Sequence, residues 1–304
     1  MTDRFASPTS LQEALAILAR DQSARPVAGG TDLVVASRQG RKPLPESIVA
    51  IDRIAELDHH GVVDGQLVLG ALTSHAWLAG AAPVREHWTA LADASSIVGS
   101  PATRGTGTIG GNLMNASPAA ETTAPLVVFG ANVILRAMGR GSRIVPVERL
   151  AIGPGRTSAD LVELLTTVMV PAPAPSSGSA YIRLEYRRAM EIAVVGAAAF
   201  VALAEDGSIA VARVALTAVA PTIVRAPEAE AILVGAPASA ETFRSAAAAA
   251  AAAARPIDDV RASADYRRAM LAVVVTRTVA AAVARARRED IPIPASRWAH
   301  GQEV

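Results

Sequence analysis

Two glycine segments about eighty positions apart hold the residues with the clearest chemical potential. The first runs Pro26-Val27-Ala28-Gly29-Gly30-Thr31-Asp32-Leu33, and the second runs Thr108-Ile109-Gly110-Gly111-Asn112. Glycine lets a backbone adopt positive φ and bring its N–H groups close to a ligand. Successive N–H groups exposed in this way form a concavity that attracts anions, above all phosphate. Two such segments favour a pyrophosphate held from both sides, and therefore a dinucleotide.

Each segment also has an alternative interpretation. The first can be a simple strand-to-helix turn with Thr31 or Asp32 as the N-cap. The second overlaps Gly105-Thr106-Gly107-Thr108-Ile109-Gly110, which matches the G-x-G-x-x-G fingerprint. That fingerprint needs a strand before it and a helix after it, whereas residues 98–104 are loop-like and Pro118 interrupts an early helix. We therefore expect these glycines to bind phosphate as a loop and not as a helix N-terminus.

A polar segment, Asn115-Ala116-Ser117-Pro118-Ala119-Ala120-Glu121, follows the second glycine segment. The Glu121 carboxylate can accept hydrogen bonds from ribose or ribityl hydroxyls. It can equally cap a helix that begins at Thr122. Both roles for Glu121 remain open at this point.

Composition excludes several classes of function. A length of 304 residues predicts about two domains, and a net charge of +1 without a basic stripe argues against nucleic acid as a partner. The absence of cysteine excludes disulfides, thiolate metal sites and iron–sulfur ligation by this chain. The five histidines lack the i,i+4 spacing of a helical metal pair, so surface or capping roles are expected for them.

Targeting segments are not evident. Residues 1–10 contain no apolar core typical of a secretory signal. The alanine run at 246–254 is about half the length that spans a bilayer. We expect a cytoplasmic protein with no transmembrane segment.

The chain before Pro171 is predicted to form two units of helices and short strands. Ser10-Leu11-Gln12-Glu13 is a capping box that opens a helix, and the apolar face of that helix is Leu11, Leu15 and Leu18. Further elements are expected as strands at 26–28, 47–51 and 67–69, a helix after Thr73, a helix around 88–94, a helix and strand within 126–135, and a strand at 161–170.

A linker at 171–179 is predicted to separate these units from a third. Its prolines stiffen the chain and its Ser/Gly end loosens it. Strands at 192–204 and 209–219 follow, joined by a hairpin turn at Glu205-Asp206-Gly207. Helices are expected at 227–234, 239–254 and 263–288, the last ending in Arg285, Arg287 and Arg288, which suit a helix C-terminus.

Four ordered motifs together resemble a known family. They are AGGTDL at 28–33, RGTGTIGGN at 104–112, NASPAAE at 115–121 and RRAMEIAVVGAA at 187–198. In these motifs the chain resembles the FAD-binding (medium) subunit of molybdenum hydroxylases, the family of xanthine dehydrogenase, aerobic carbon monoxide dehydrogenases and nicotine dehydrogenases.

The resemblance implies an α+β fold and a cofactor site. A two-subdomain, vanillyl-alcohol-oxidase-like (PCMH-type) FAD-binding domain would occupy 1–57 and 58–175, followed by a C-terminal α+β domain at 176–290 and a tail at 291–304. The two glycine segments would wrap the pyrophosphate of FAD, and Glu121 would lie near the ribityl or ribose hydroxyls. Leu165 would lie beside the adenine or flavin ring. Arg183 stands where many relatives have lysine, and so places a planar fork at a position usually held by a point charge.

The resemblance also implies a function. The chain would be an electron-transfer subunit without catalytic residues or metal of its own, passing electrons to an external acceptor. The [2Fe–2S] clusters would lie on a small partner subunit and molybdopterin on a large one, in a dimer of heterotrimers. Two alternatives remain: a stand-alone flavin-dependent oxidase of the vanillyl-alcohol-oxidase superfamily, which needs a substrate cavity over the flavin, and a non-catalytic partner protein.

Overall fold

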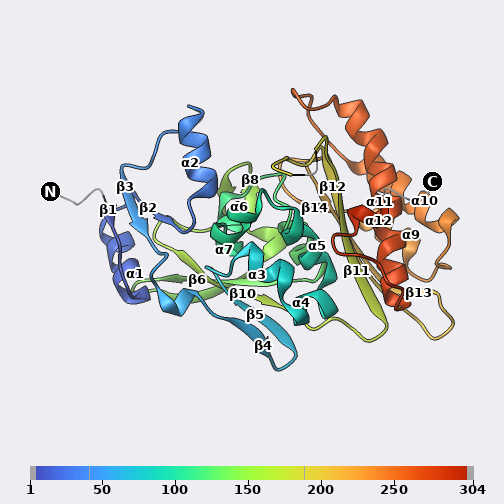
Figure 1. Cartoon of the computed structure of the whole chain (residues 1–304), viewed down its shortest axis with the longest axis horizontal. Coiled ribbons are helices and arrows are strands. Elements are labelled where there is room, and N and C mark those ends of the chain that lie inside the picture. The colour runs from blue at the N-terminus through green and yellow to red at the C-terminus, as the bar shows by residue number, and fades with distance from the viewer. Residues whose placement is uncertain (1–4, 41, 188, 300–304) are drawn as a thin grey trace.

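The structure, a computed structural model, describes residues 5–40, 42–187 and 189–299. Arg188 of the fourth motif, His300 and the rest of the predicted tail beyond 299 lie outside the described residues. Within the described chain, helices and strands form three units that follow one another along the long axis of the molecule, in chain order (Figure 1).

The first unit is built on a parallel sheet with strand order β1-β3-β2. Ser10 caps α1 as predicted, since its Oγ accepts the Glu13 N–H at 3.2 Å. Leu15 and Leu18 of α1 are buried in the core of this unit. Helix α2 stands apart and buries no residue. The elements are β1 (Phe5–Ala6), α1 (Leu11–Arg20), β2 (Ala24–Val27), α2 (Thr31–Arg38), β3 (Ser47–Ala50) and η1 (Ala55–Leu57).

The second unit is an antiparallel sheet with strand order β4-β5-β10-β6-β7. Helices α3 to α8 connect β5 to β6 and cover the sheet (Figure 1). The strands are β4 (His60–Val63), β5 (Gln66–Gly70), β6 (Asn132–Ala137), β7 (Gly141–Pro146) and β10 (Leu164–Val170), with β8 (Ala151–Gly153), β9 (Arg156–Thr157) and η2 (Val147–Arg149) between the last two. The helices are α3 (His75–Gly80), α4 (Ala82–His87), α5 (Thr89–Ile97), α6 (Pro101–Thr106), α7 (Ile109–Asn115) and α8 (Thr123–Val128).

The third unit is an antiparallel sheet with order β11-β12-β13-β14, covered by helices. The predicted hairpin joins β12 to β13, with Gly207 at a φ of 82°. The proline-initiated helix is also confirmed, with Gly235 just beyond it at a φ of 79°. The elements are β11 (Ser177–Leu184), β12 (Val195–Leu203), β13 (Ile209–Thr217), β14 (Val224–Arg225), α9 (Pro227–Leu233), α10 (Ala240–Ala253), α11 (Ala264–Ala286) and α12 (Ser296–Ala299).

The Ser/Gly end of the expected linker is not loose. Ser177 already begins β11 and pairs with Ala202 of β12. A Cβ on Gly178 would collide with the backbone of α11 at Ala282 and Ala286. Glycine at this position therefore lets a strand pack directly on a helix backbone, which the linker interpretation missed.

Arg285 does not serve the end of α11, contrary to the expectation from its position. Its guanidinium turns to α5 and donates to both carboxylate oxygens of Asp93, at 2.6 and 2.9 Å. Asp93 is fully buried and also accepts the backbone N–H groups of Tyr181 at 3.0 Å and Ala295 at 2.9 Å. This carboxylate therefore connects the second unit to the third through four hydrogen bonds.

Helix α11 is long and apolar enough to span a membrane by length and composition, alone among the described residues. It packs against β11, β12 and α10, and 56% of its most apolar stretch is buried. Its apolar residues belong to the core of the third unit. The composition of α11 is therefore explained by packing inside the protein.

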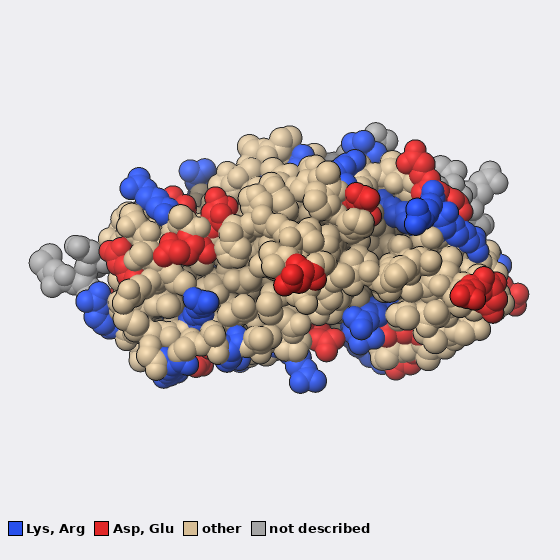
Figure 2. Space-filling model, turned by 90° about the horizontal axis from the view of Figure 1, so that it is seen from below, with Lys and Arg blue, Asp and Glu red and all other residues tan. Residues whose placement is uncertain are grey.

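Charged side chains of both signs share the face of the molecule seen from below. Figure 2 shows basic and acidic side chains interspersed on that face, with no continuous basic stripe among the described residues drawn there. A nucleic-acid-binding surface requires such a clustering of positive charge. This face therefore lacks the electrostatic pattern typical of nucleic-acid binding.

Substitution Asp93→Ala tests the connection between the units. We expect the free energy of unfolding to fall by about 3–5 kcal/mol, because the Arg285 guanidinium would remain buried without its carboxylate. Urea denaturation followed by circular dichroism measures this loss. The control is Asp160→Ala, which removes an exposed ion pair with Arg140 at 3.2 Å and should cost less than about 1 kcal/mol. Equal losses in the two variants would contradict the role assigned to Asp93.

Candidate functional site

The first glycine segment lies backbone to backbone against residues 106–107, just before the second segment. A Cβ on Gly29 would collide with the carbonyl oxygen of Thr106, just before the second segment. A Cβ on Gly107 would lie 2.9 Å from the Thr103 carbonyl oxygen and 3.5 Å from Thr31 Oγ1. Glycine at position 29 permits an approach that any other side chain would prevent, whereas a Cβ at position 107 would be in ordinary contact with Thr31.

The first segment ends at the start of α2 with unpaired amides. Gly30 is the N-cap and adopts the left-handed conformation, with a φ of 65°. Thr31 and Asp32 are therefore inside the helix, and the prediction that one of them is the N-cap is wrong. No side chain caps α2, and among the described residues the N–H groups of Thr31, Asp32 and Leu33 have no acceptor. A helix start with free N–H groups is favourable for an anion.

The second segment is a helix start and not a loop. Thr108 is the N-cap of α7, and its Oγ1 accepts the Gly111 N–H at 3.0 Å. The supposedly loop-like stretch upstream contains α6, which Ser100 caps through the Thr103 N–H at 3.1 Å. Pro118 lies beyond the end of α7 and does not interrupt it. Two hydroxyl caps outweigh the low helix propensity of glycine here.

The amides of the second segment already have acceptors in the protein. The Ile109 N–H donates to the Thr73 carbonyl at 2.9 Å, and the Gly110 N–H donates to the Ala71 carbonyl at 3.0 Å. A Cβ on Gly110 would lie 2.7 Å from the same Ala71 oxygen. Gly110 is therefore required for contact with the end of β5. These amides are therefore engaged within the protein, where the second segment supports the first. The contact of Thr108 to Asn112 with a cofactor stays a prediction.

Asn112 and the residues after it continue this support. The Thr122 hydroxyl donates to Asn112 Oδ1 at 2.6 Å, which ties α7 to the start of α8. Helix α8 begins at Thr123 with Thr122 as its N-cap and receives no side-chain cap bond. The helix-capping role left open for Glu121 is therefore wrong.

Glu121 instead forms a buried ion pair with Arg183 of β11. The Arg183 Nε also donates to Glu185 at 2.6 Å, so one guanidinium lies between two carboxylates. The structure thus brings together two residues that were predicted separately. Sequence reasoning missed Glu185, although its i,i+2 spacing from Arg183 places both side chains on one side of an extended chain.

The electrostatics of this cluster follow from its burial. Burial raises the pKa of the Glu121 carboxyl, the Arg183 guanidinium opposes that rise, and the Asp32 carboxylate adds to it. Asp32 belongs to the first glycine segment. The acidic cluster and the free amides of α2 are therefore parts of one site.

His75 is a further member of the site that sequence reasoning placed at a surface or cap. Its backbone N–H donates to the Gly107 carbonyl at 3.1 Å, and its ring carbon Cδ2 lies 3.2 Å from where a Gly107 Cβ would be. The side chain is buried, and its Nδ1 has no partner among the described residues. Burial, together with the positive charge of Arg104, lowers its pKa to about 4, so the ring is neutral above that pH.

Leu165 lies in the apolar core of the second unit and not in the glycine segments. It is 2% exposed, opposite Leu135 in the sheet of the second unit, and it belongs to the same apolar core as Ile109. The contact with a cofactor ring expected for Leu165 stays a prediction.

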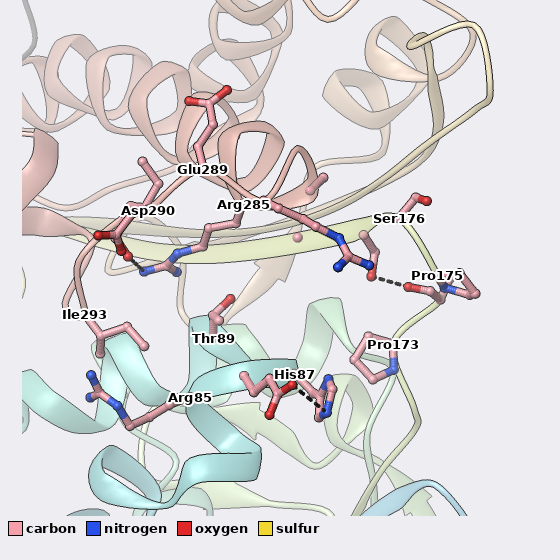
Figure 3. A pocket seen from close by; sticks show the side chains of 17 residues that line it. Arg85, His87, Thr89, Pro173, Pro175, Ser176, Arg285, Glu289, Asp290 and Ile293 are labelled. Atoms are coloured by element: carbon pink, nitrogen blue, oxygen red, sulfur yellow. Dashed lines mark hydrogen bonds and ion pairs between the residues drawn. The ribbon is translucent and has the colours of Figure 1, made fainter.

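A groove of about 640 Å³ lies elsewhere, between the second and third units (Figure 3). Arg85, His87 and Thr89 line one side, and Arg285 and Ile293 line the other. None of its lining residues comes from the glycine segments or from the Glu121–Arg183 cluster. The groove is therefore separate from the candidate site.

Comparison with known families matches nearly the whole chain. Residues 2–173 match the FAD binding domain in molybdopterin dehydrogenase. Residues 180–282 match the CO dehydrogenase flavoprotein C-terminal domain.

Individual proteins are similar over most of their length. The alpha subunit of the 6-hydroxypseudooxynicotine dehydrogenase complex of Paenarthrobacter nicotinovorans is 33% identical over 91% of this chain and 93% of its own. The xanthine dehydrogenase FAD-binding subunit of Escherichia coli O157:H7 is 30% identical over 91% and 94%. A solved structure of carbon monoxide dehydrogenase from Hydrogenophaga pseudoflava superposes with a TM-score of 0.88 at 33% identity, covering 92% of this chain and 97% of its own.

Substitution Arg183→Met tests the buried cluster. We expect the free energy of unfolding at pH 7 to fall by about 3–5 kcal/mol, because Glu121 and Glu185 would lose their shared cation. Without that cation the folded-state pKa of Glu121 rises further above its ordinary value of 4.5. Stability of the variant should therefore be greatest below that value and decrease as the pH rises through the raised folded-state pKa.

Urea unfolding of wild type and variant between pH 4.5 and 8 measures this pH dependence. Arg183→Lys is the matched control, because it keeps the charge and should keep a pH dependence close to that of the wild type. A Met variant whose stability follows the wild-type pH profile would contradict the electrostatic assignment.

Proposed function

Because this chain belongs to the family of FAD-binding subunits of molybdopterin dehydrogenases, we propose that it is the electron-transfer subunit of a multi-subunit molybdenum hydroxylase. In this role it holds FAD and passes electrons from the [2Fe–2S] clusters of a partner subunit to an external acceptor. The observation that carries the proposal is the free amide cluster at the start of α2, placed against the second glycine segment within a family match that spans the chain.

The residues present fit FAD. Its diphosphate needs donors that do not already have acceptors, and Thr31, Asp32 and Leu33 provide three such N–H groups. The glycines at 29 and 30 let the backbone approach a phosphate closely. We assign Pro26 to Leu33 to the diphosphate and adjacent sugar, and Thr108 to Asn112 to the wall that supports them.

The acidic cluster provides the second part of the proposed cofactor site. Glu121 has a second carboxylate oxygen besides the one that pairs with Arg183, so it can accept a hydrogen bond from a hydroxyl of the cofactor. Arg183 holds Glu121 in place through their ion pair. We retain Leu165 as a residue behind the ring, where its bulk would support the wall of the site.

The work of the protein in this reaction is binding and orientation. FAD, when bound, supplies the chemistry of accepting electrons and releasing them one or two at a time. The main-chain N–H groups of Thr31, Asp32 and Leu33 would hold the cofactor, and the Glu121–Arg183 pair would set the local charge. No residue is assigned a catalytic role.

The partners follow from what the chain lacks. It contains no cysteine, and iron–sulfur clusters are held by cysteine thiolates. We therefore place the clusters on a small partner subunit and molybdopterin on a large one, in a dimer of heterotrimers located in the cytoplasm. The relatives are named for xanthine, carbon monoxide and 6-hydroxypseudooxynicotine, which supports a substrate chosen by a partner subunit.

A stand-alone flavin oxidase fits less well. Such an enzyme needs a substrate cavity over the flavin, whereas the described groove of about 640 Å³ shares no residue with the glycine segments. A non-catalytic partner protein would not need free amides at the start of α2. Both alternatives predict different behaviour on purification.

Purification of the full chain distinguishes the three functions. We expect a yellow protein with about one FAD per chain that oxidises neither xanthine, carbon monoxide nor nicotine derivatives alone, because the substrate-oxidising cofactors lie on partners. Co-expression with its neighbouring genes should yield a complex that contains molybdenum and iron by metal analysis. Turnover by the isolated yellow chain would support the oxidase instead, and a colourless chain that does not take up FAD would support the non-catalytic partner.

Substitution Gly29→Ala tests the junction of the two segments. We expect flavin content to fall more than about tenfold, because the added Cβ would collide with the Thr106 carbonyl and push the segments apart. The control is Gly105→Ala at the fifth residue of α6, where a Cβ meets nothing within 4 Å. Flavin absorbance per chain and the melting temperature of each variant provide the measurements. Full flavin content in the Gly29 variant would exclude this junction as the cofactor site.

A further inference from the structure

His75 is a buried side chain beside the junction of the glycine segments, and one of its ring nitrogens is unpaired. It is 2% exposed, and its Nδ1 has no hydrogen-bond partner among the described residues. Buried nitrogen atoms of this kind usually have a partner, so an orphaned one calls for an explanation.

The position of the ring supplies that explanation. His75 Cδ2 and Thr31 Oγ1 lie 3.2 and 3.5 Å from the same point, the place of a Gly107 Cβ. The ring therefore borders the space where α2 begins with free amides. A half-turn about the Cβ–Cγ bond exchanges Cδ2 with Nδ1 and leaves the ring outline almost unchanged. That rotation would direct the orphaned nitrogen toward the start of α2.

The surrounding charges identify the class of ligand. Arg104 is close enough to act on the imidazole as a positive charge, and the first turn of α2 offers three N–H donors. A neutral imidazole can carry its proton on Nδ1 and donate it. A donor, a cation and free amides around one point all favour an anion.

We propose that the Nδ1–H of His75 donates a hydrogen bond to the diphosphate of FAD, which makes His75 a cofactor-binding residue beyond the two glycine segments. This inference rests on the proposed function. It deepens that function by adding a side-chain donor from α3 to the main-chain amides that are proposed to bind the diphosphate.

Binding of nucleotides to the flavin-free full chain tests the proposal. Isothermal titration with FAD, ADP and adenosine separates the diphosphate from the adenine and ribose. We expect His75→Leu to weaken FAD and ADP about 10- to 100-fold, the usual effect of losing a hydrogen bond to a charged group. Binding of adenosine, which lacks the diphosphate, should not change.

Conservative variants locate the donor on the ring. In His75→Asn the amide nitrogen stands close to the position of Nδ1, whereas in His75→Gln it stands close to that of Nε2. We expect the Asn variant to keep most of the wild-type affinity for ADP and the Gln variant to lose it as the Leu variant does. His60→Leu is the matched control. His60 lies in β4, is exposed, and stacks on Trp77 of α3, the helix that contains His75, with ring centroids 4.1 Å apart.

A measurement on the wild-type chain covers the case in which His75 variants do not fold. Long-range proton–nitrogen NMR spectra of histidine-labelled protein report the state of each ring nitrogen. The Nδ1 signal of His75 should shift on addition of ADP and stay in place on addition of adenosine. An Nδ1 signal that ADP leaves unchanged, or a Leu variant with wild-type affinity for ADP, overturns this inference alone. A wild-type chain that binds neither FAD nor ADP overturns the proposed function itself.

Discussion

The close approach of Gly29 to the Thr106 carbonyl is the constraint on which the rest of the site depends. It joins the start of α2 to the end of α6, which belong to different units, and only the absence of a side chain makes it possible. The N-terminus of α7 is capped by a side chain and the N-terminus of α2 is not, so the two helix starts take different roles. The amides of α7 are held by Ala71, Thr73 and the Thr108 hydroxyl, so the site keeps its shape without a ligand. The amides of α2 remain free and provide the attraction for an anion.

Buried charges hold the units around this junction. Arg183 reaches from β11 to Glu121 in front of α8, and Arg285 reaches from α11 to Asp93 in α5. Both connect the second unit to the third, and both carboxylates are deeply buried. Breaking such a pair costs far more than the pair itself contributes, because a single charge stays behind in an apolar environment. The two ion pairs act together with the apolar core in which α5 and α8 pack against β11, β12 and β13.

This arrangement suits a protein that positions a redox cofactor. The histidine at the junction is neutral above a pKa of about 4, and the acidic cluster is bound to arginine, so neither is poised to exchange protons with a substrate. The diversity of names among similar proteins, from xanthine to carbon monoxide, agrees with a subunit whose site is independent of what the complex oxidises.

Local patterns in the sequence determined the elements that depend on short-range forces. The Ser10 cap, the Gly207 hairpin and the proline start of α9 were predictable, because each depends on a few neighbouring residues. The four motifs also sufficed to indicate the family and its cofactor. Contacts over long distances in the chain were not predictable in the same way. That Glu121 meets Arg183, that Arg285 leaves its helix end for Asp93, and that His75 is buried beside Gly107 were all decided by tertiary structure. The reason is physical: hydroxyl caps and turns satisfy backbone groups nearby, whereas a buried charge or an orphaned ring nitrogen is defined by whichever distant segment the fold brings next to it.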